Sequence, residues 1–127
     1  MHLIGIGVDL VEVARLDRAL RQHGERFVAR VYREEEARYC RDGARPVERF
    51  AVRFAAKEAV MKALGTGWAA GVGFQQIEVV RDGGGAPSIR LHGEARRRAE
   101  AMGVQDVAIS LSHTASCAVA FVVCRGI

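Results

Sequence analysis

The sequence predicts an α+β fold, in which a small antiparallel sheet packs on a long central helix within one domain of residues 1–127. Residues 50–64 consist mainly of strong helix formers and place apolar side chains on two sides of a helix. Residues 3–10 alternate as a strand does, and the two glycines on one face, Gly5 and Gly7, allow another backbone to approach. The length and the half-apolar composition are typical of one globular domain.

The central helix should be covered on two sides, because it carries two apolar stripes where an ordinary surface helix carries one. Phe50, Phe54 and Met61 form the first stripe. The second consists mostly of small residues, namely Val52, Ala56, Ala59, Val60 and Ala63. We expect the helix to follow a loop at residues 43–46 and to end at Gly65, since glycine readily adopts the left-handed conformation that terminates helices.

The sectors between these stripes hold four charged side chains, with Arg53 and Lys57 on one flank and Glu58 and Lys62 on the other. One interpretation is ordinary surface pairing, with Glu58 and Lys62 as an i,i+4 ion pair. The other is a site in which three cations and one carboxylate receive an anionic ligand and a metal ion. Composition favours the second, because all but two of the 19 basic residues are arginine, and the two lysines are Lys57 and Lys62.

The other elements follow from periodicity and turn residues. Residues 12–42 are helical in composition with a break at His23–Gly24, and Glu34–Glu36 open a further helix. Two hairpins are predicted, one from residues 77–81 and 87–91 around the turn at 82–85, and one from residues 107–113 and 117–124. Between them, residues 93–102 form a short helix with solvent-facing Arg96, Arg97 and Arg98.

Charge and cysteine content predict the kind of partner the protein binds and the compartment in which it works. The net charge is +4, and the arginines of the first half favour an anionic or acidic partner. Acidic residues interrupt the only early apolar run, so we expect no N-terminal signal and no membrane-spanning segment. The three cysteines are odd in number and lack metal-type spacing, which fits reduced thiols in the cytoplasm; they are Cys40, Cys117 and Cys124.

Three further features permit two interpretations each. Asp9 lies on the glycine face of the first strand, either within reach of Glu58 or as a strand-ending turn residue. His113 and Thr114 at a strand tip can bind phosphate oxygens or form the turn. A flank of the first helix forms either a solvated face or a docking surface for an acidic partner; its residues are Arg15, Arg18 and Arg21.

Three blocks, taken together, resemble one family. They are Gly5-Ile6-Gly7-Val8-Asp9, then Arg53-Phe54-Ala55-Ala56-Lys57-Glu58-Ala59 with Lys62 and Gly65-Thr66-Gly67, then Ser112-His113-Thr114. In this order and over nearly the whole length, the chain resembles the holo-[acyl-carrier-protein] synthases, the small bacterial type of 4′-phosphopantetheinyl transferase. The resemblance implies Mg²⁺-dependent transfer of phosphopantetheine from coenzyme A to a serine of apo acyl carrier protein in fatty acid biosynthesis. Adenosine 3′,5′-bisphosphate is the implied by-product.

The resemblance also implies roles for individual residues. Asp9 and Glu58 become metal ligands, and Glu58 and Lys62 become catalytic residues. The implied coenzyme A contacts are Arg53, Lys57, Lys62, Gly65, Thr66, Gly67, His113 and Thr114. The family is a homotrimer with active sites between subunits, and its carrier protein docks on the first helix. Phosphoryl-type transfer agrees with these residues, since it needs positioning and charge neutralisation, and Mg²⁺ prefers carboxylate and phosphate oxygens.

One departure and one alternative remain. Arg33 stands where family members usually carry threonine, three residues before Glu36, so the sequence assigns no role to Glu36. The alternative function is that of a small basic RNA-associated protein without catalysis. The chain lacks aromatic residues interleaved with its basic ones, as single-stranded RNA binding would favour, so we expect no nucleic-acid partner.

Overall fold

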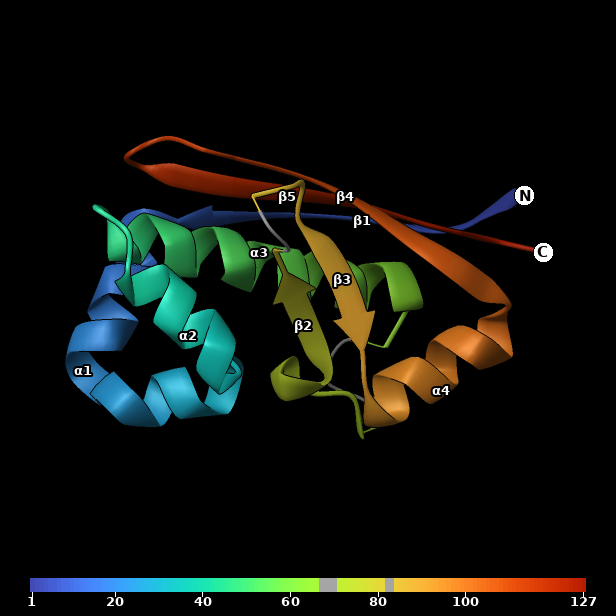
Figure 1. The fold of residues 1–127 in the computed structure, drawn as a ribbon, viewed down its shortest axis with the longest axis horizontal. Helices are drawn as coiled ribbons and strands as arrows, with labels where there is room; N and C mark the ends of the chain where they lie inside the picture. Colours follow the sequence, from blue (N-terminus) through green and yellow to red (C-terminus); the bar gives the residue numbers. More distant parts are fainter. Residues whose placement is uncertain (67–70, 82–83) are drawn as a thin grey trace.

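The computed structural model describes residues 1–66, 71–81 and 84–127. Along the chain the elements are β1 (His2–Glu12), α1 (Val13–Val31), α2 (Glu34–Arg41), α3 (Pro46–Leu64), the 3-10 turn η2 (Phe74–Gln76), β2 (Ile77–Val80), β3 (Ser88–Leu91), α4 (Gly93–Met102), β4 (Val104–His113) and β5 (Cys117–Gly126). Helix α3 runs through the middle, with a sheet on one side and α1, α2 and the β2–β3 hairpin on the other (Figure 1). The predicted fold class is therefore confirmed.

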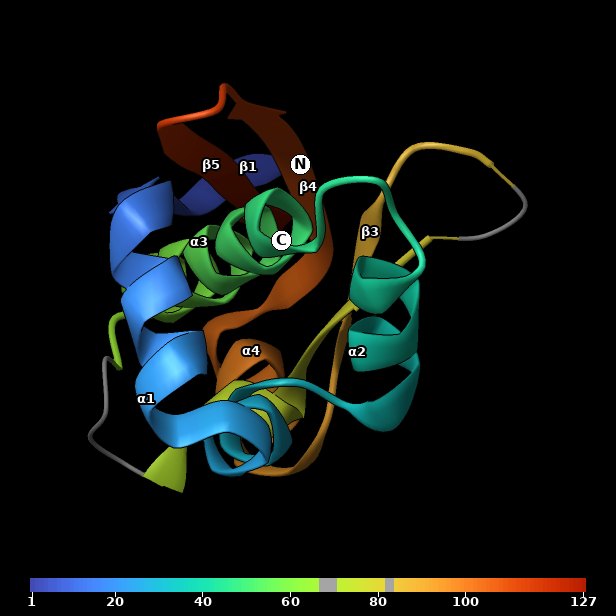
Figure 2. The same ribbon diagram turned by 90° about the vertical axis from the view of Figure 1, so that its left-hand side faces the viewer.

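The larger sheet is antiparallel throughout, in the order β1-β5-β4. The first and last strands of the chain are neighbours, so that Val8 faces Phe121 and Asp9 faces Ala120. Strands β2 and β3 form a separate hairpin. The view along α3 shows the helix enclosed by the sheet, α1, α2 and α4 (Figure 2).

The two glycines of β1 lie directly on the backbone of α3, as the sequence predicts. A Cβ atom at Gly7 would stand 1.9 Å from the carbonyl oxygen of Ala59, and one at Gly5 would stand 2.2 Å from that of Ala63. Both distances are well inside van der Waals contact. Small residues on both sides of the contact therefore allow the strand and the helix to pack backbone against backbone.

Helix α3 is buried on both predicted sides. Phe50, Met61 and the small residues of the second stripe are almost fully enclosed. The helix begins at Pro46, earlier than predicted, because a proline at the first helical position loses no hydrogen bond. It ends as predicted at Gly65, whose φ of 69° is left-handed.

Of two further predictions, one is confirmed and one is incomplete. Helix α1 does break at Gly24, whose φ of 50° is left-handed. Arg98 on α4 was expected to face solvent only, but its Nε donates to the carbonyl oxygen of Leu64 at 3.1 Å and so caps the end of α3. All three cysteines are free thiols. Among the described residues, no helix has the length and apolar character needed to cross a membrane.

Candidate active site

Two carboxylates meet where β1 packs on α3. Asp9 comes from the glycine face of the strand and Glu58 from the helix. Partial burial and the negative charge of Asp9 raise the pKa of Glu58, while the positive charges of Arg15 and Lys62 act in the opposite direction. The two carboxylates therefore interact electrostatically, which agrees with the expected proximity of Asp9 and Glu58.

Lys62 lies in the same cluster but does not make the ion pair that its spacing from Glu58 suggests. Its Nζ donates to Asp9 Oδ1 at 2.9 Å and to the carbonyl oxygen of Val8 at 2.9 Å. Within the described ranges, no ion pair joins Lys62 to Glu58. The tertiary approach of β1 offers Lys62 a carboxylate and a carbonyl together, and this replaces the i,i+4 contact.

The donor set of this cluster fits a hard cation. No group of three or more histidine, cysteine, aspartate or glutamate side chains that could hold a metal occurs in residues 1–66, 71–81 and 84–127. Zinc sites use such closed sets of protein ligands. Mg²⁺ instead uses one or two carboxylates together with phosphate oxygens and water, which is what Asp9 and Glu58 can supply.

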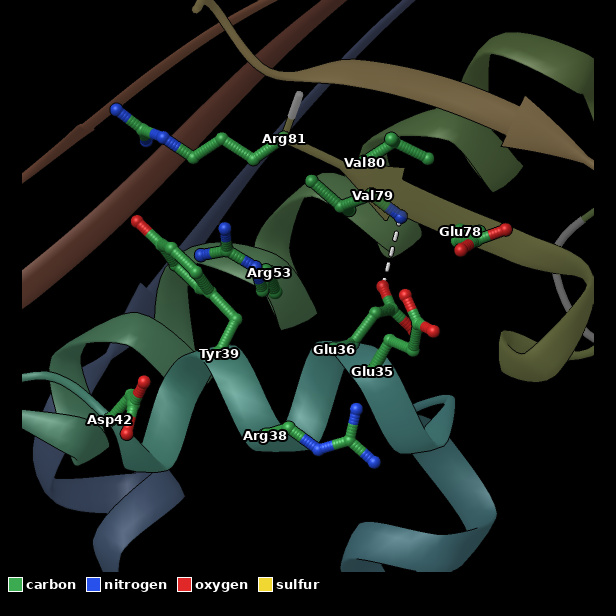
Figure 3. A pocket seen from close by; sticks show the side chains of 10 residues that line it. All are labelled: Glu35, Glu36, Arg38, Tyr39, Asp42, Arg53, Glu78, Val79, Val80 and Arg81. Atoms are coloured by element: carbon green, nitrogen blue, oxygen red, sulfur yellow. Dashed lines mark hydrogen bonds between the residues drawn. The ribbon is translucent and has the colours of Figure 1, made fainter. Parts of the chain in front are cut away.

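The other flank of α3 carries a cluster of arginines around Tyr39. The guanidinium groups of Arg49 and Arg53 each lie 4.2 Å from the centre of the Tyr39 ring, and that of Arg81 lies 5.9 Å away. Arg53 is only 4% exposed, and its Nε has no hydrogen-bond partner among the described residues. Figure 3 shows Arg53 from α3, Tyr39 from α2 and Arg81 after β2 lining one pocket. A buried, unpartnered guanidinium nitrogen suits an anionic ligand.

His113 belongs to this second cluster. Its Nδ1 lies 3.0 Å from Glu48 Oε1, and its ring lines a cavity of about 510 Å³ together with Arg49, Arg53 and Arg81. Thr114 has the turn role that was one of its two interpretations. Its Oγ1 accepts the backbone N–H groups of Ser116 at 3.3 Å and of Cys117, the first residue of β5, at 3.1 Å.

Lys57 does not fit the predicted phosphate contact. It is fully buried, and its Nζ donates to Glu36 Oε1 at 2.7 Å, to the Phe74 carbonyl at 3.1 Å and to the Ile77 carbonyl at 2.6 Å. These three bonds use all the protons of the ammonium group. Burial lowers the pKa of Lys57, and the charge of Glu36 opposes that shift.

Glu36 is the ion-pair partner of Lys57, a role that the sequence analysis did not assign to it. In addition to the hydrogen bond from Lys57, the Glu36 carboxylate accepts one from the backbone N–H of Val79 at 2.9 Å, which is drawn in Figure 3. It accepts another from the backbone N–H of Arg33 at 2.8 Å. The carboxylate therefore connects α2 to α3 and to strand β2. The only sequence signal for this role was a glutamate at the family position, and the arginine that replaces threonine obscured it.

The turn after α3 is described only in part. Gly65 caps the helix, and the side-chain oxygen of Thr66 is buried without a hydrogen-bond partner among the described residues. Gly67, the third predicted contact of this turn, lies outside the described residues. Thr66 thus offers a second unpartnered polar atom close to the end of α3.

The two clusters face opposite sides of the central helix. Arg53 and Lys62 are nine positions apart, and at about 100° per residue this spacing places them half a turn from each other. The structure thus brings Asp9, Glu58 and Lys62 together, and separately brings Arg53 and His113 together. Within the described part of the chain, the cavities that Arg53 and His113 line do not include Asp9, Glu58 or Lys62.

The arginines of α1 differ in their surroundings. All three side chains are exposed. Arg21 pairs with Asp17 at 3.1 Å, whereas Arg15 is near enough to Glu58 for its positive charge to oppose the rise in the pKa of that carboxyl. For Arg18 no ion pair is found within the described part of the chain. The flank therefore begins at the carboxylate cluster and continues into solvent.

Residues 5–121 match the family model of the 4′-phosphopantetheinyl transferase superfamily, which covers both clusters. The chain belongs to this superfamily. Among curated members, it is 46% identical over 121 residues to a holo-[acyl-carrier-protein] synthase of Solibacter usitatus, covering 95% of this chain and 97% of the relative. It is 50% identical to one of Halorhodospira halophila, covering 95% and 96%.

Solved structures of the superfamily share the fold. A holo-[acyl-carrier-protein] synthase of Neisseria meningitidis superimposes with a TM-score of 0.89 at 34% identity, covering 98% of this chain and 99% of that one. One of Helicobacter pylori, solved in complex with coenzyme A, has a TM-score of 0.82 at 30% identity, covering 94% and 99%. At this similarity the arrangement of elements around α3 is that of the superfamily.

Proposed function

We propose that the chain is a Mg²⁺-dependent holo-[acyl-carrier-protein] synthase. It transfers 4′-phosphopantetheine from coenzyme A to a serine hydroxyl of apo acyl carrier protein, for fatty acid biosynthesis. The observation that carries the proposal is the convergence of Asp9, Glu58 and Lys62 at the contact of β1 with α3, in a chain of this superfamily. A relative solved with coenzyme A supports the donor.

The reaction exchanges one phosphorus–oxygen bond for another. The serine oxygen bonds to the phosphorus next to pantetheine, and the bond from that phosphorus to the bridging oxygen breaks, releasing adenosine 3′,5′-bisphosphate. Asp9 and Glu58 would hold Mg²⁺, which supplies charge neutralisation at the diphosphate. Lys62 stabilises the negative charge that grows on the leaving group. Glu58 or a water beside it takes the serine proton.

Arg53 and His113 are proposed to bind the phosphates of the nucleotide half of coenzyme A. The support is the unpartnered, buried Nε of Arg53 and the cavity of about 510 Å³ that both residues line. Arg49 adds a further positive charge to the same cavity. We keep the Gly65-Thr66-Gly67 turn as a phosphate contact, since the side-chain oxygen of Thr66 is buried without a partner in the described chain. Lys57 is left out of this set.

We propose that the protein works as a homotrimer with active sites between copies. Two observations support this assembly. The carboxylate cluster and the arginine cluster face opposite sides of α3, so a ligand that needs both must touch two copies. The outer face of the sheet exposes large apolar side chains, namely Ile6 (55%), Val8 (50%), Leu10 (65%) and Phe121 (42%). Such a patch marks a protein interface.

The direct test is mass spectrometry of an apo acyl carrier protein after incubation with coenzyme A and MgCl₂. We expect the carrier to gain one phosphopantetheine with the wild-type protein and none when EDTA replaces magnesium. Glu58→Gln should reduce turnover by roughly a thousandfold or more, because it removes metal-binding charge at constant volume. The matched control is Glu100→Gln, which changes an exposed carboxylate on α4 and should retain activity.

Unchanged turnover and Mg²⁺ dependence in Glu58→Gln would exclude the metal assignment. Absence of transfer by the wild-type protein, together with salt-sensitive binding to single-stranded RNA, would instead favour the RNA-associated alternative.

The α1 arginines are proposed to dock the carrier, and Arg18 gives the cleanest test. It is exposed, and no ion pair involving it occurs in the described residues, whereas Arg15 acts on Glu58 and Arg21 is neutralised by Asp17. Arg18→Glu should raise the KM for the carrier roughly tenfold and flatten its salt dependence, with the KM for coenzyme A nearly unchanged. Steady-state kinetics at two salt concentrations measure both. An increase in the KM for coenzyme A instead would show that Arg18 contacts coenzyme A and not the carrier.

A further inference from the structure

The contacts of Lys62 have a consequence for metal binding. Its ammonium group lies 2.9 Å from Asp9 Oδ1, and a second bond to the Val8 carbonyl oxygen, also at 2.9 Å, holds it there. The side chain of Asp9 is only 12% exposed, so its carboxylate has few other approaches. A cation that binds this oxygen of Asp9 must therefore compete with the ammonium group of Lys62 for it.

The charge balance of the cluster also opposes the binding of a metal cation on its own. The cluster contains two carboxylates, Asp9 and Glu58, and two nearby cations, Lys62 and Arg15. The charges cancel, so a divalent cation entering alone would leave the cluster with two excess positive charges. A diphosphate diester carries one negative charge on each phosphate, and entering together with the cation it restores neutrality. It also offers the displaced ammonium of Lys62 a new anionic partner.

We propose that Lys62 is a resident counter-ion of Asp9 that opposes metal binding until a diphosphate draws its ammonium group away. The divalent cation and the diphosphate ligand then bind with positive cooperativity, and each raises the affinity for the other by the same factor. The proposal rests on the proposed function for the identity of the metal and of the diphosphate. What it adds is a role for Lys62 in the order of assembly, before any bond is broken.

The test measures Mn²⁺ affinity by electron paramagnetic resonance of the free ion, with no carrier protein present. Wild-type protein, Lys62→Met and Arg15→Met are each titrated alone, with coenzyme A, and with adenosine 3′,5′-bisphosphate, which lacks the diphosphate bridge. Binding of Mn²⁺ to the nucleotides themselves is measured separately and subtracted. Arg15→Met removes the same charge, but within the described residues Arg15 makes no hydrogen bond to Asp9.

Without nucleotide, we expect Lys62→Met to bind Mn²⁺ roughly fivefold more tightly than wild type, and Arg15→Met to show a smaller increase. Coenzyme A should tighten Mn²⁺ binding to wild type by roughly tenfold or more, the bisphosphate by less. In Lys62→Met the tightening by coenzyme A should shrink. Arg125→Met, which removes a cation paired with Asp106 on the far part of the sheet, should leave the Mn²⁺ affinity unchanged.

Equal or weaker Mn²⁺ binding in nucleotide-free Lys62→Met would overturn the proposal, as would the absence of any coenzyme A effect in wild type. Those results leave the proposed function standing if wild type still modifies the carrier protein. Conversely, a wild-type protein that shows the Mn²⁺ coupling but transfers nothing would refute the proposed function and support the counter-ion role. If Mn²⁺ binds none of the proteins under any condition, both the metal site and the role of Lys62 are refuted.

Discussion

The two lysines of the chain have different physical roles, although the sequence presents them as a pair. Lys57 is enclosed and paired with a carboxylate that is itself 3% exposed, while the side chain of Lys62 is 53% exposed. An isolated charge is costly to bury, so Lys57 and Glu36 can be tolerated only together and with their remaining hydrogen bonds made. The buried pair fixes the positions of α2, α3 and the β2–β3 hairpin relative to one another. This places Arg81 and Tyr39 around Arg53.

Replacing one member of this pair should therefore destabilise the protein strongly. We expect Lys57→Met to lower the free energy of unfolding by about 3–5 kcal/mol, because it leaves Glu36 charged and buried. The double variant Lys57→Met with Glu36→Gln should recover part of the loss, since the amide is neutral and still accepts the N–H of Val79. Urea denaturation followed by circular dichroism measures both.

Lys62→Met is the matched control for Lys57→Met. It removes an ammonium group from a half-exposed ion pair, and its cost should stay within about 1 kcal/mol. Equal losses of stability at the two lysines would show that Lys57 is not held by a buried pair. In that case its phosphate-binding role would have to be reconsidered.

At the scale of elements, the contact of β1 with α3 forms the carboxylate cluster of Asp9 and Glu58, which is the proposed metal site. Residue spacing in β1 puts Gly5, Gly7 and Asp9 on one face, so the glycines that let the backbones touch also aim Asp9 at the helix. The contact is close because neither side has a bulky residue there. Any side chain at Gly7 would push the strand away from α3 and move Asp9 away from Glu58.

Gly7→Ala should thus impair both stability and activity. Its Cβ would lie 1.9 Å from the Ala59 carbonyl oxygen, and we expect a loss of about 3 kcal/mol or more, since backbone cannot yield as a flexible side chain does. The control is Gly73→Ala, where a Cβ meets nothing within 4 Å and φ is −126°, so the change should stay within about 0.5 kcal/mol. Thermal unfolding compares the two. A stable, active Gly7→Ala would mean that β1 does not pack on α3 this closely.

At the scale of the whole molecule, the sheet has one face on α3 and one face that exposes large apolar side chains. Val8 and Phe121 are register partners on that outer face, at the pair of strands formed by the two ends of the chain. A second copy of the chain on this face would cover the patch. In the proposed trimer, the carboxylate cluster of one copy meets the arginine cluster of another.

Phe121→Lys should convert the proposed trimer into monomers and abolish transfer while the monomer stays folded, as light scattering and circular dichroism can measure. Ala101→Lys, an equal change at an exposed position on α4, should alter neither property. A sharper test combines two inactive variants, Glu58→Gln and Arg53→Ala, which are mixed, dissociated into monomers and allowed to reassemble. If each site combines residues of two copies, the mixed assemblies should recover part of the activity. A wild-type protein that is monomeric and active would contradict the assembly.

Much of this protein follows from local sequence rules. The two stripes of α3, its left-handed cap at Gly65, the break at Gly24 and the glycine face of β1 all depend on neighbours within a few residues, and helix and strand periodicity predicts them. Asp9 and Glu58 were also predictable as a pair, because one face of a strand and one side of a helix were already specified.

The tertiary structure alone decided which partner each charge takes. Spacing along α3 put Arg53 with Lys57 and Glu58 with Lys62, but the fold gives Lys57 to Glu36, Lys62 to Asp9 and Arg53 to Tyr39. Each of these partners comes from a distant segment, and an enclosed carboxylate or ring outweighs an exposed i,i+4 contact worth a few tenths of a kcal/mol. The separation of Arg53 from Lys62 follows from their spacing along the helix, but only the fold brings Tyr39 and Arg81 to Arg53 on one flank and Asp9 to Lys62 on the other.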